Sequence, residues 1–437
     1  MADKKQQTSG DKSYEGCYGE ISKPSEVKGW LVRLSEDNIA HQDKGHPRWA
    51  GCIWGHPGVG KTSLARDLST TPVSFRGKEY PGYAIAYVPL AQIEEMGDIH
   101  GVPEDFILMS SKVDEQGNVA PGSETKWVMA KDVVMTTYLE RGWHIPANTR
   151  TVTKTCPPDW VPTEERPGIL ILDDANRASI RIMKGIMQLM QDYRTIGWEM
   201  PAGWTIVCTG NPDMQTYLVT TVDDAVITRQ RHITMRTDAK EWAIWASQHK
   251  VDPRGINFLL KYPEMMVGVR TNPRTLTEFF RCLERHPDIT ATPETRKAVM
   301  VDGKSLIDEE TVISFMTFAT RDMGLVIEPE RILNDADSVL PELKRLMAGK
   351  EARIDIVSVT CDRLYAFLAQ PDYKVQPQHV VNFQKFIMTD DLENDMRHSL
   401  LKRMAVCHDK PELKTFMLKN NAILKFVGEA LRMSGTL

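Results

Sequence analysis

The stretch GHPGVGKTS, residues 55–63, constrains the fold more than any other part of the sequence. It matches the pattern G-x-x-x-x-G-K-[ST], follows a short apolar run and precedes a segment with the composition of a helix. In a loop of this kind the backbone N–H groups turn inward around phosphate oxygens, and the N-terminus of the following helix adds the positive end of its dipole. The stretch therefore predicts a strand–loop–helix unit that binds a nucleoside triphosphate. The alternative is a glycine-rich turn before an ordinary helix.

Two side chains of this loop carry specific chemistry. We expect the Lys61 ammonium to reach the β- and γ-phosphates and the Thr62 hydroxyl to bind Mg²⁺. The residues expected to surround the nucleotide are Gly55, His56, Pro57, Gly58, Val59, Gly60, Lys61, Thr62 and Ser63.

A second stretch, ILILDDANRA at residues 169–178, ends an apolar run in two adjacent aspartates. Carboxylates rarely lie at the end of a buried strand unless a partner compensates their charge. In phosphate-loop enzymes one such acid holds Mg²⁺ and a neighbouring acid orients or deprotonates the attacking water. We therefore predict a metal-binding role for Asp173 and a base role for Asp174. The alternative is a charged strand end that caps the next helix.

The pattern of short apolar runs predicts the fold class. The runs cover residues 51–54, 83–90, 168–172, 204–210 and 231–235. Their alternation with helical patterns indicates βαβ units and a largely parallel sheet, and helical patterns dominate after residue 238. We expect an α/β phosphate-loop NTPase core with a parallel sheet flanked by helices, followed by an all-helical lid and a helical C-terminal domain.

The expected boundaries follow from these changes of pattern. They are a flexible N-terminus at 1–20, the core at 21–237 with an insertion at about 97–131, the lid at 238–288 and the C-terminal domain at 289–437. The insertion is inferred because the interval from Lys61 to Asp173 is longer than two strand–helix crossovers of roughly 30 residues each require. Long insertions in compact domains are usually functional. The family resemblance described below implies that this segment faces a central pore or a partner.

Composition excludes several classes of protein. The net charge of −5 gives no global attraction to nucleic acid or anionic lipid. The seven cysteines are scattered without a C-x-x-C pair, which argues against a disulfide framework and a zinc ribbon. No signal sequence or membrane-length apolar run is visible, so we expect a cytoplasmic protein.

Four stretches in consistent order resemble the AAA+ ATPases of the MoxR group, which includes CobS-like chelatase subunits and phage-encoded relatives. They are GHPGVGKT, GILILDDANRA, PAGWTIVCTGNPD and DDAVITRQRHI, and the resemblance extends from about residue 49 to residue 283. It implies an ATP- and Mg²⁺-dependent ATPase that forms a homo-oligomeric ring, typically a hexamer. It also implies a chaperone-like task on a partner protein, such as one with a von Willebrand A domain.

The resemblance assigns roles to three further residues. Asn211 matches the sensor-1 residue that positions the attacking water, and its alternative is an Asn-Pro turn. Arg229 matches the arginine finger that reaches the γ-phosphate of a neighbouring subunit, and Arg274 matches the sensor-2 residue of the lid. An ordinary surface arginine is the alternative for Arg229, and a helix-start arginine is the alternative for Arg274.

The sequence departs from the family pattern at two of these places. Asp174 stands where the family usually has glutamate, and the shorter side chain predicts slower hydrolysis. Gln230 stands where an aromatic residue is common, and Arg231 is a second candidate for the finger.

Three functions therefore remain open at the level of sequence. The first is a ring ATPase that remodels, matures or assembles a partner protein. The second is a ring motor on nucleic acid, which the acidic balance disfavours, and the third is a slow, nucleotide-gated scaffold. A D-x-x-G stretch at 98–101 fits a GTPase pattern, but the absence of an N-K-x-D motif argues against that interpretation. The choice between ATP and GTP stays open because the wider clade of the resembling family includes a relative that uses GTP.

Overall fold

The computed structural model describes residue 14 and residues 17–212, 224–289, 291–349, 352–407, 410–418, 420, 421 and 423–425. The chain forms two compact units. The first consists of Met1–His56 and Lys61–Arg236, and the second of Pro57–Gly60 and Thr237–Leu437. Most of the predicted N-terminal segment at 1–20 lies outside the described residues.

The first unit contains a six-stranded parallel sheet in the order β1-β11-β2-β10-β9-β5. The strands are β1 (Glu20–Ser22), β2 (Ala50–Trp54), β5 (Ala84–Pro89), β9 (Gly168–Asp173), β10 (Trp204–Gly210) and β11 (Gln230–Met235). A two-stranded hairpin, β3 (Val73–Phe75) and β4 (Lys78–Tyr80), lies outside this sheet. The predicted α/β fold with a parallel sheet is confirmed, and the strand from the phosphate loop, β2, is separated from β9 by β10.

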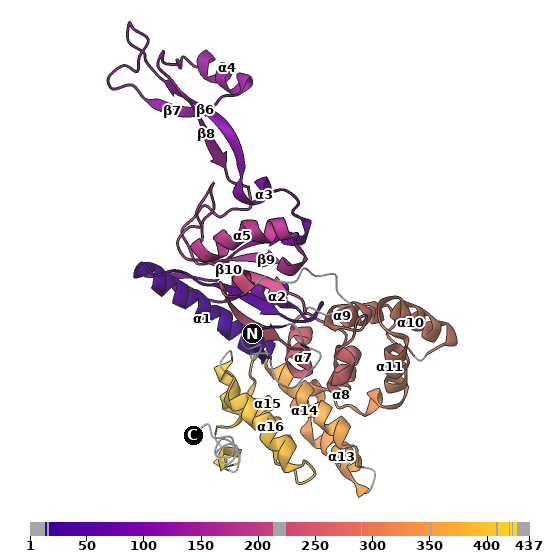
Figure 1. The fold of residues 1–437 in the computed structure, drawn as a ribbon. Helices are drawn as coiled ribbons and strands as arrows, with labels where there is room; N and C mark the ends of the chain where they lie inside the picture. The colour runs from indigo at the N-terminus through magenta and orange to yellow at the C-terminus, as the bar shows by residue number, and fades with distance from the viewer. Residues whose placement is uncertain are drawn as a thin grey trace, which may run out of the picture. The chain divides into compact units, whose positions relative to one another are not determined.

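Helices cover both faces of the sheet, which explains why its strands are continuous apolar runs. Alternate residues of β9 point to opposite faces, and Leu170 and Leu172 belong to the hydrophobic core beneath α5 (Ile180–Asp192). On the other face, the backbone of Gly51 packs against Trp30 and Leu34 of α1 (Pro24–Asp43), leaving no room for a side chain there. Figure 1 shows α1 and α5 on either side of the strands.

The insertion forms a small antiparallel sheet of its own in the order β7-β6-β8. Its elements are β6 (Val102–Ser110), β7 (Thr125–Met129), α4 (Asp132–Glu140) and β8 (Thr151–Cys156), so the sheet continues beyond the predicted range of 97–131. The short helix α3 (Gly97–His100) leads into it, and the Trp198 indole N–H donates to the Ile99 carbonyl at 2.7 Å. Figure 1 shows the small sheet beyond α3, as a separate lobe within the first unit.

The described part of the second unit is helical from Ala239 onward and contains two hydrophobic cores. One core is built mainly by α7 (Ala239–Gln248), α8 (Pro253–Lys261), α9 (Pro273–Cys282), α10 (Pro293–Leu306) and α11 (Glu309–Arg321). The other is built mainly by α12 (Pro329–Asn334), α13 (Ala336–Met347), α14 (Ile354–Leu368), α15 (Pro377–Met388) and α16 (Asn394–Ala405). Among the described residues, no helix has the length and apolar character needed to span a membrane.

Candidate nucleotide-binding site

The phosphate loop joins β2 to α2 (Lys61–Arg66) and depends on glycine at two positions. Gly58 has φ of 78° and Gly60 has φ of 100°, a region that side chains with a Cβ rarely adopt. A Cβ on Gly58 would also lie 2.2 Å from Oδ1 of Asn272, the N-cap of α9. The spacing of the glycines is therefore required by the backbone path of the loop.

Lys61 is the first residue of α2 and is only 6% exposed. Its ammonium donates to the carbonyls of Gly55 at 2.7 Å and His56 at 3.1 Å, and to Oδ1 of Asn211 at 3.0 Å. A buried ammonium is costly unless acceptors surround it, and these three oxygens supply that environment. Phosphate oxygens entering the loop would meet a lysine that is already oriented there.

Asp173, the last residue of β9, receives hydrogen bonds from three hydroxyl groups. Oδ1 accepts from Thr62 Oγ1 and from Thr209 Oγ1, each at 2.6 Å, and Oδ2 accepts from the Tyr87 hydroxyl at 3.0 Å. Burial alone would raise the pKa of Asp173, but the bonds from Thr209, Thr62 and Tyr87 and the charge of Lys61 together lower it. The carboxylate therefore stays ionised at neutral pH, next to the threonine expected to share its metal.

Asp174 adopts a left-handed backbone conformation with φ of 52°, which is uncommon outside glycine. Its N–H donates to Thr209 Oγ1 at 2.9 Å, and its carboxylate accepts from Asn211 Nδ2 at 2.8 Å. Residues held in sparsely populated backbone regions cluster at functional sites. Because Asn211 also accepts from Lys61, one amide side chain connects the loop lysine to the predicted base.

Asn211 is itself fixed by a buried partner. Asn176 Nδ2 donates to the Asn211 carbonyl at 2.7 Å, and the Asn211 N–H donates to Asn176 Oδ1 at 3.1 Å. Both residues are 2% exposed, so the pair positions the sensor side chain.

The structure thus brings five predicted site residues into one hydrogen-bonded cluster, called here the acid cluster: Lys61, Thr62, Asp173, Asp174 and Asn211. The sequence reasoning missed Thr209, Tyr87 and Asn176, which hold its members. Asn176 lies in the same stretch as the two acids, and Thr209 precedes Asn211 by two residues at the end of β10. These positions offered a signal, because side chains at the carboxyl ends of adjacent parallel strands meet at one edge of the sheet.

The donor set fits Mg²⁺ held together with a triphosphate. Mg²⁺ is bound through one or two carboxylates plus substrate phosphates rather than by a protein cage. Among the described residues, no group of three His, Cys, Asp or Glu side chains is placed to bind a metal. Thr62 and Asp173 supply a hydroxyl and an ionised carboxylate in contact with each other, as that mode of binding needs.

Arg229 lies between α6 (Asp224–Ile227) and β11 and is half-buried. Its Nε donates to Gln191 Oε1 on α5 at 2.7 Å, and its Nη1 donates to the Ala225 carbonyl. These bonds go to neighbours in the same chain and not to the acid cluster. The competing candidate Arg231 is paired with Asp37 at 2.7 Å.

Arg274 lies exposed in the first turn of α9, in the second unit. The N-cap Asn272 accepts from the Arg274 N–H at 3.1 Å, and this same Asn272 side chain packs against Gly58 of the phosphate loop. The sensor-2 role of Arg274 stays a prediction.

Thr209→Val tests the newly found support for the acid cluster. The change removes the hydroxyl that donates to Asp173 and accepts from the Asp174 N–H, with little change of volume. Outer-shell partners of a metal site typically contribute about 10–100-fold to metal affinity or activity, so the Mg²⁺ concentration for half-maximal ATP hydrolysis should rise by about that factor. Thr205→Val is the matched control, because it removes a buried hydroxyl of the same strand that bonds Asn38. An equal effect in both variants would mean that only strand stability had changed.

No protein-family model matches the chain, and no curated protein matches it. Among solved structures, a lysine-to-arginine variant of RuvB from Thermotoga maritima is similar over 74% of this chain and 78% of that one, with 15% identity and a TM-score of 0.33. RuvB described as the Holliday junction branch migration motor of the same organism covers 72% of this chain and 76% of that one, with 16% identity and a TM-score of 0.29. The sheet order, the phosphate loop with its acid cluster and the helical second unit give this chain the AAA+ type of phosphate-loop fold.

Proposed function

We propose that this protein is a Mg²⁺-dependent ATPase of the MoxR group that works as an oligomeric ring and remodels, matures or assembles a partner protein. The observation that carries the proposal is the acid cluster, in which Thr62 contacts Asp173 while Asn211 contacts both Lys61 and Asp174. A glycine-rich turn that binds no ligand does not require a buried lysine or two carboxylates at the same edge of the sheet, and placing these charged groups there is energetically costly.

The proposed roles follow from these contacts. Lys61 would exchange its bond to Asn211 for phosphate oxygens, leaving the Asn211 amide free to hold a water together with Asp174. Asp174 accepts the proton of that water or orients it for attack on the γ-phosphate. Thr62 and Asp173 would hold Mg²⁺, which would supply positive charge to neutralise the charge that develops on the phosphates.

The ring rests on Arg229. A finger arginine supplied by a neighbouring copy completes a site only between subunits, so a closed ring satisfies every site at once. Gln191 and Ala225 hold the Arg229 side chain in one orientation, which suits a group presented to a neighbour. The partner role rests on the family resemblance and on the folded insertion, and the chain's net charge of −5 favours a protein client over nucleic acid.

Mixing two inactive variants tests the shared site. Lys61→Ala and Arg229→Ala should each lose most ATP hydrolysis, for different reasons. In a random equal mixture, about a quarter of the sites pair an intact loop with an intact finger from the next copy, so phosphate release should return to about that fraction. The mass of the complex in ATP should be measured on the same samples. Rings that form but never regain activity on mixing would contradict the shared site, and loss of hydrolysis in Arg231→Ala alone would move the finger to Arg231.

A further inference from the structure

The small sheet of the insertion has two unlike faces. On one face Met109 and Val128 are buried, and α4 lies over this side, where Lys126 packs against the ring of Tyr138 at 5.3 Å. Because register pairs Leu108 with Trp127 and Phe106 with Val152, these four residues share the opposite face. Trp127 is 38% exposed and Val152 is 37% exposed, so this second face is open to solvent.

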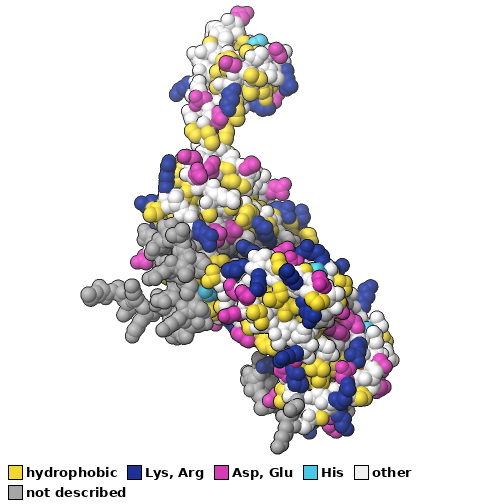
Figure 2. Space-filling model, turned by 90° about the vertical axis from the view of Figure 1, so that its right-hand side faces the viewer, with side chains coloured by type: hydrophobic (Ala, Val, Ile, Leu, Met, Phe, Trp, Pro, Cys, Tyr) yellow, Lys and Arg dark blue, Asp and Glu magenta, His cyan; other side chains and the backbone are white. Residues whose placement is uncertain are grey.

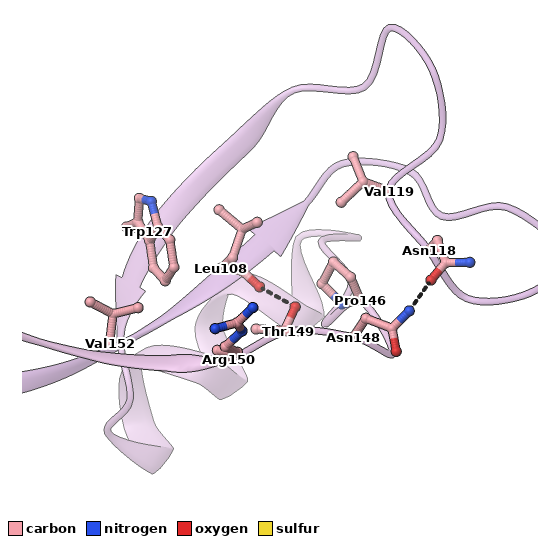
Figure 3. Close-up of a pocket in the computed structure, with 9 residues that line it drawn as sticks. All are labelled: Leu108, Asn118, Val119, Trp127, Pro146, Asn148, Thr149, Arg150 and Val152. Carbon is pink, nitrogen blue, oxygen red and sulfur yellow. Dashed lines mark hydrogen bonds between the residues drawn. The ribbon is translucent and has the colours of Figure 1, made fainter.

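The open face contains a pocket of about 580 Å³, called here the Trp127 pocket. Leu108, Trp127 and Val152 form its apolar floor, and Val119 and Pro146 form a side wall (Figure 3). Polar groups form the rim, where Asn148 Nδ2 donates to Asn118 Oδ1 at 2.9 Å and Thr149 Oγ1 donates to the Leu108 carbonyl at 3.4 Å. An apolar floor with a few fixed polar groups at its edge is typical of a binding pocket.

Two cations lie at this pocket, and Glu104 is directly opposite one of them, Lys154, in the strand register. The Lys154 ammonium lies 4.7 Å from the centre of the Trp127 ring, and Arg150 lines the pocket. Among residues 102–156, all of which the structure describes, Glu104 is paired with Lys131 at 2.8 Å, and no carboxylate forms an ion pair with Arg150 or Lys154. Figure 2 shows hydrophobic side chains in yellow exposed among dark blue Lys and Arg and magenta Asp and Glu on the uppermost lobe, which is the insertion.

These features fit a peptide better than a nucleic acid. A nucleic-acid strand carries a charge on every phosphate and is bound along a positively charged groove, whereas this face offers two cations with Glu104 opposite one of them, on an acidic protein. The pocket volume of about 580 Å³ can accommodate a large apolar side chain of a bound peptide. The cations at the pocket edge can pair with a carboxylate elsewhere on the same peptide.

We propose that the Trp127 pocket binds an extended segment of the partner protein that places a large apolar side chain on Leu108 and Trp127 and an acidic side chain beside Arg150. This inference rests on the proposed function, because it names the chemistry of the partner on which the ATPase acts. The aromatic side chain and the arginine are the residue types that dominate binding energy at protein interfaces.

Selection from a random peptide library displayed on phage tests the proposal on the full chain in ATP. The wild-type protein should enrich sequences that combine Asp or Glu with Phe, Trp or Leu, and a synthetic peptide of the selected sequence should bind to it. Trp127→Ala and Arg150→Glu should each weaken that peptide by about tenfold or more, as truncation of interface anchors does. Both side chains are exposed, so the variants should fold, which unchanged thermal unfolding would verify.

The matched control is Lys126→Glu, which makes the same kind of charge change on the covered face of the sheet. It should leave peptide affinity within about twofold of the wild type. Three results would each overturn the proposal. The first is a selection that does not enrich sequences combining acidic and apolar residues, and the second is equal peptide binding by the wild type and Arg150→Glu. The third is binding of oligothymidylate that Arg150→Glu abolishes. Basal phosphate release, which should be unchanged in all three variants, reports separately on the ATPase, so failure of the pocket and failure of the proposed function are distinguishable.

Discussion

Lys61→Ala is expected to lower kcat/KM for ATP by about 10²–10³-fold, the effect of removing one preorganised charge stabiliser from an enzyme site. The ammonium is buried with three acceptors, so it is held at the loop and needs to exchange only its bond to Asn211 for phosphate oxygens. The loss should appear both in phosphate release and in binding of a fluorescent ATP analogue, because the lysine contacts bound and reacting phosphates alike.

The control for this variant is Lys184→Ala, which removes an exposed lysine from α5. It should hydrolyse ATP at the wild-type rate. Because the alanine at position 61 leaves buried oxygens without a donor, thermal unfolding of both variants should be compared before the kinetics. A folded Lys61→Ala protein that binds and hydrolyses ATP normally would contradict the assignment of the loop.

Asp174→Asn is expected to slow hydrolysis by about 10²–10⁴-fold, the usual contribution of a positioned acid or base, while ATP stays bound. Asparagine keeps the shape and tolerates the left-handed backbone at this position, so the fold should be unchanged. The amide removes the proton acceptor but leaves Lys61, Thr62 and Asp173 intact. The measurement pairs phosphate release with equilibrium ATP binding.

Two further results distinguish an ATPase that remodels its partner from a slow, nucleotide-gated scaffold. Asp174→Glu should hydrolyse ATP, because unlike Asp174→Asn it keeps a carboxylate at this position. Affinity capture with Asp174→Asn in ATP should retain the partner protein that hydrolysis normally releases. Wild-type turnover no faster than that of Lys61→Ala would instead favour the scaffold. Loss of ATP binding in Asp174→Asn would show that this acid holds the nucleotide and is not a base.

The sequence predicted the main sheet well because its strands are apolar on both faces. Ile169, Leu170, Ile171 and Leu172 are all nearly inaccessible, which requires helices on both sides and therefore a parallel α/β arrangement. The order of strands was not predictable, since the placement of β10 between β2 and β9 depends on which side chains pack across the sheet. Strand β1 was missed because Glu20–Ser22 has no apolar run and pairs with β11 through its backbone.

In the candidate site, too, residues close together in the sequence were predicted, whereas residues brought together by strand packing were not. The residues whose spacing is local, such as Lys61 with Thr62 and Asp173 with Asp174, were predicted from the sequence. Thr209 was not, because its role arises only when β10 lies beside β9 and brings its hydroxyl to a carboxylate far away along the chain. The strands of the insertion were not predicted for a related reason, since the alternating threonines of β8, for example, become part of a sheet only by pairing with β6.

A structure determined with a non-hydrolysable ATP analogue and Mg²⁺ will show whether the loop and the two aspartates bind one triphosphate–Mg²⁺ unit. We expect Lys61 to leave Asn211 and contact the β- and γ-phosphates, Thr62 and Asp173 to lie around the metal, and Asp174 to face a water beside the γ-phosphate. An empty loop at millimolar analogue, or a metal bound away from both aspartates, would contradict this expectation.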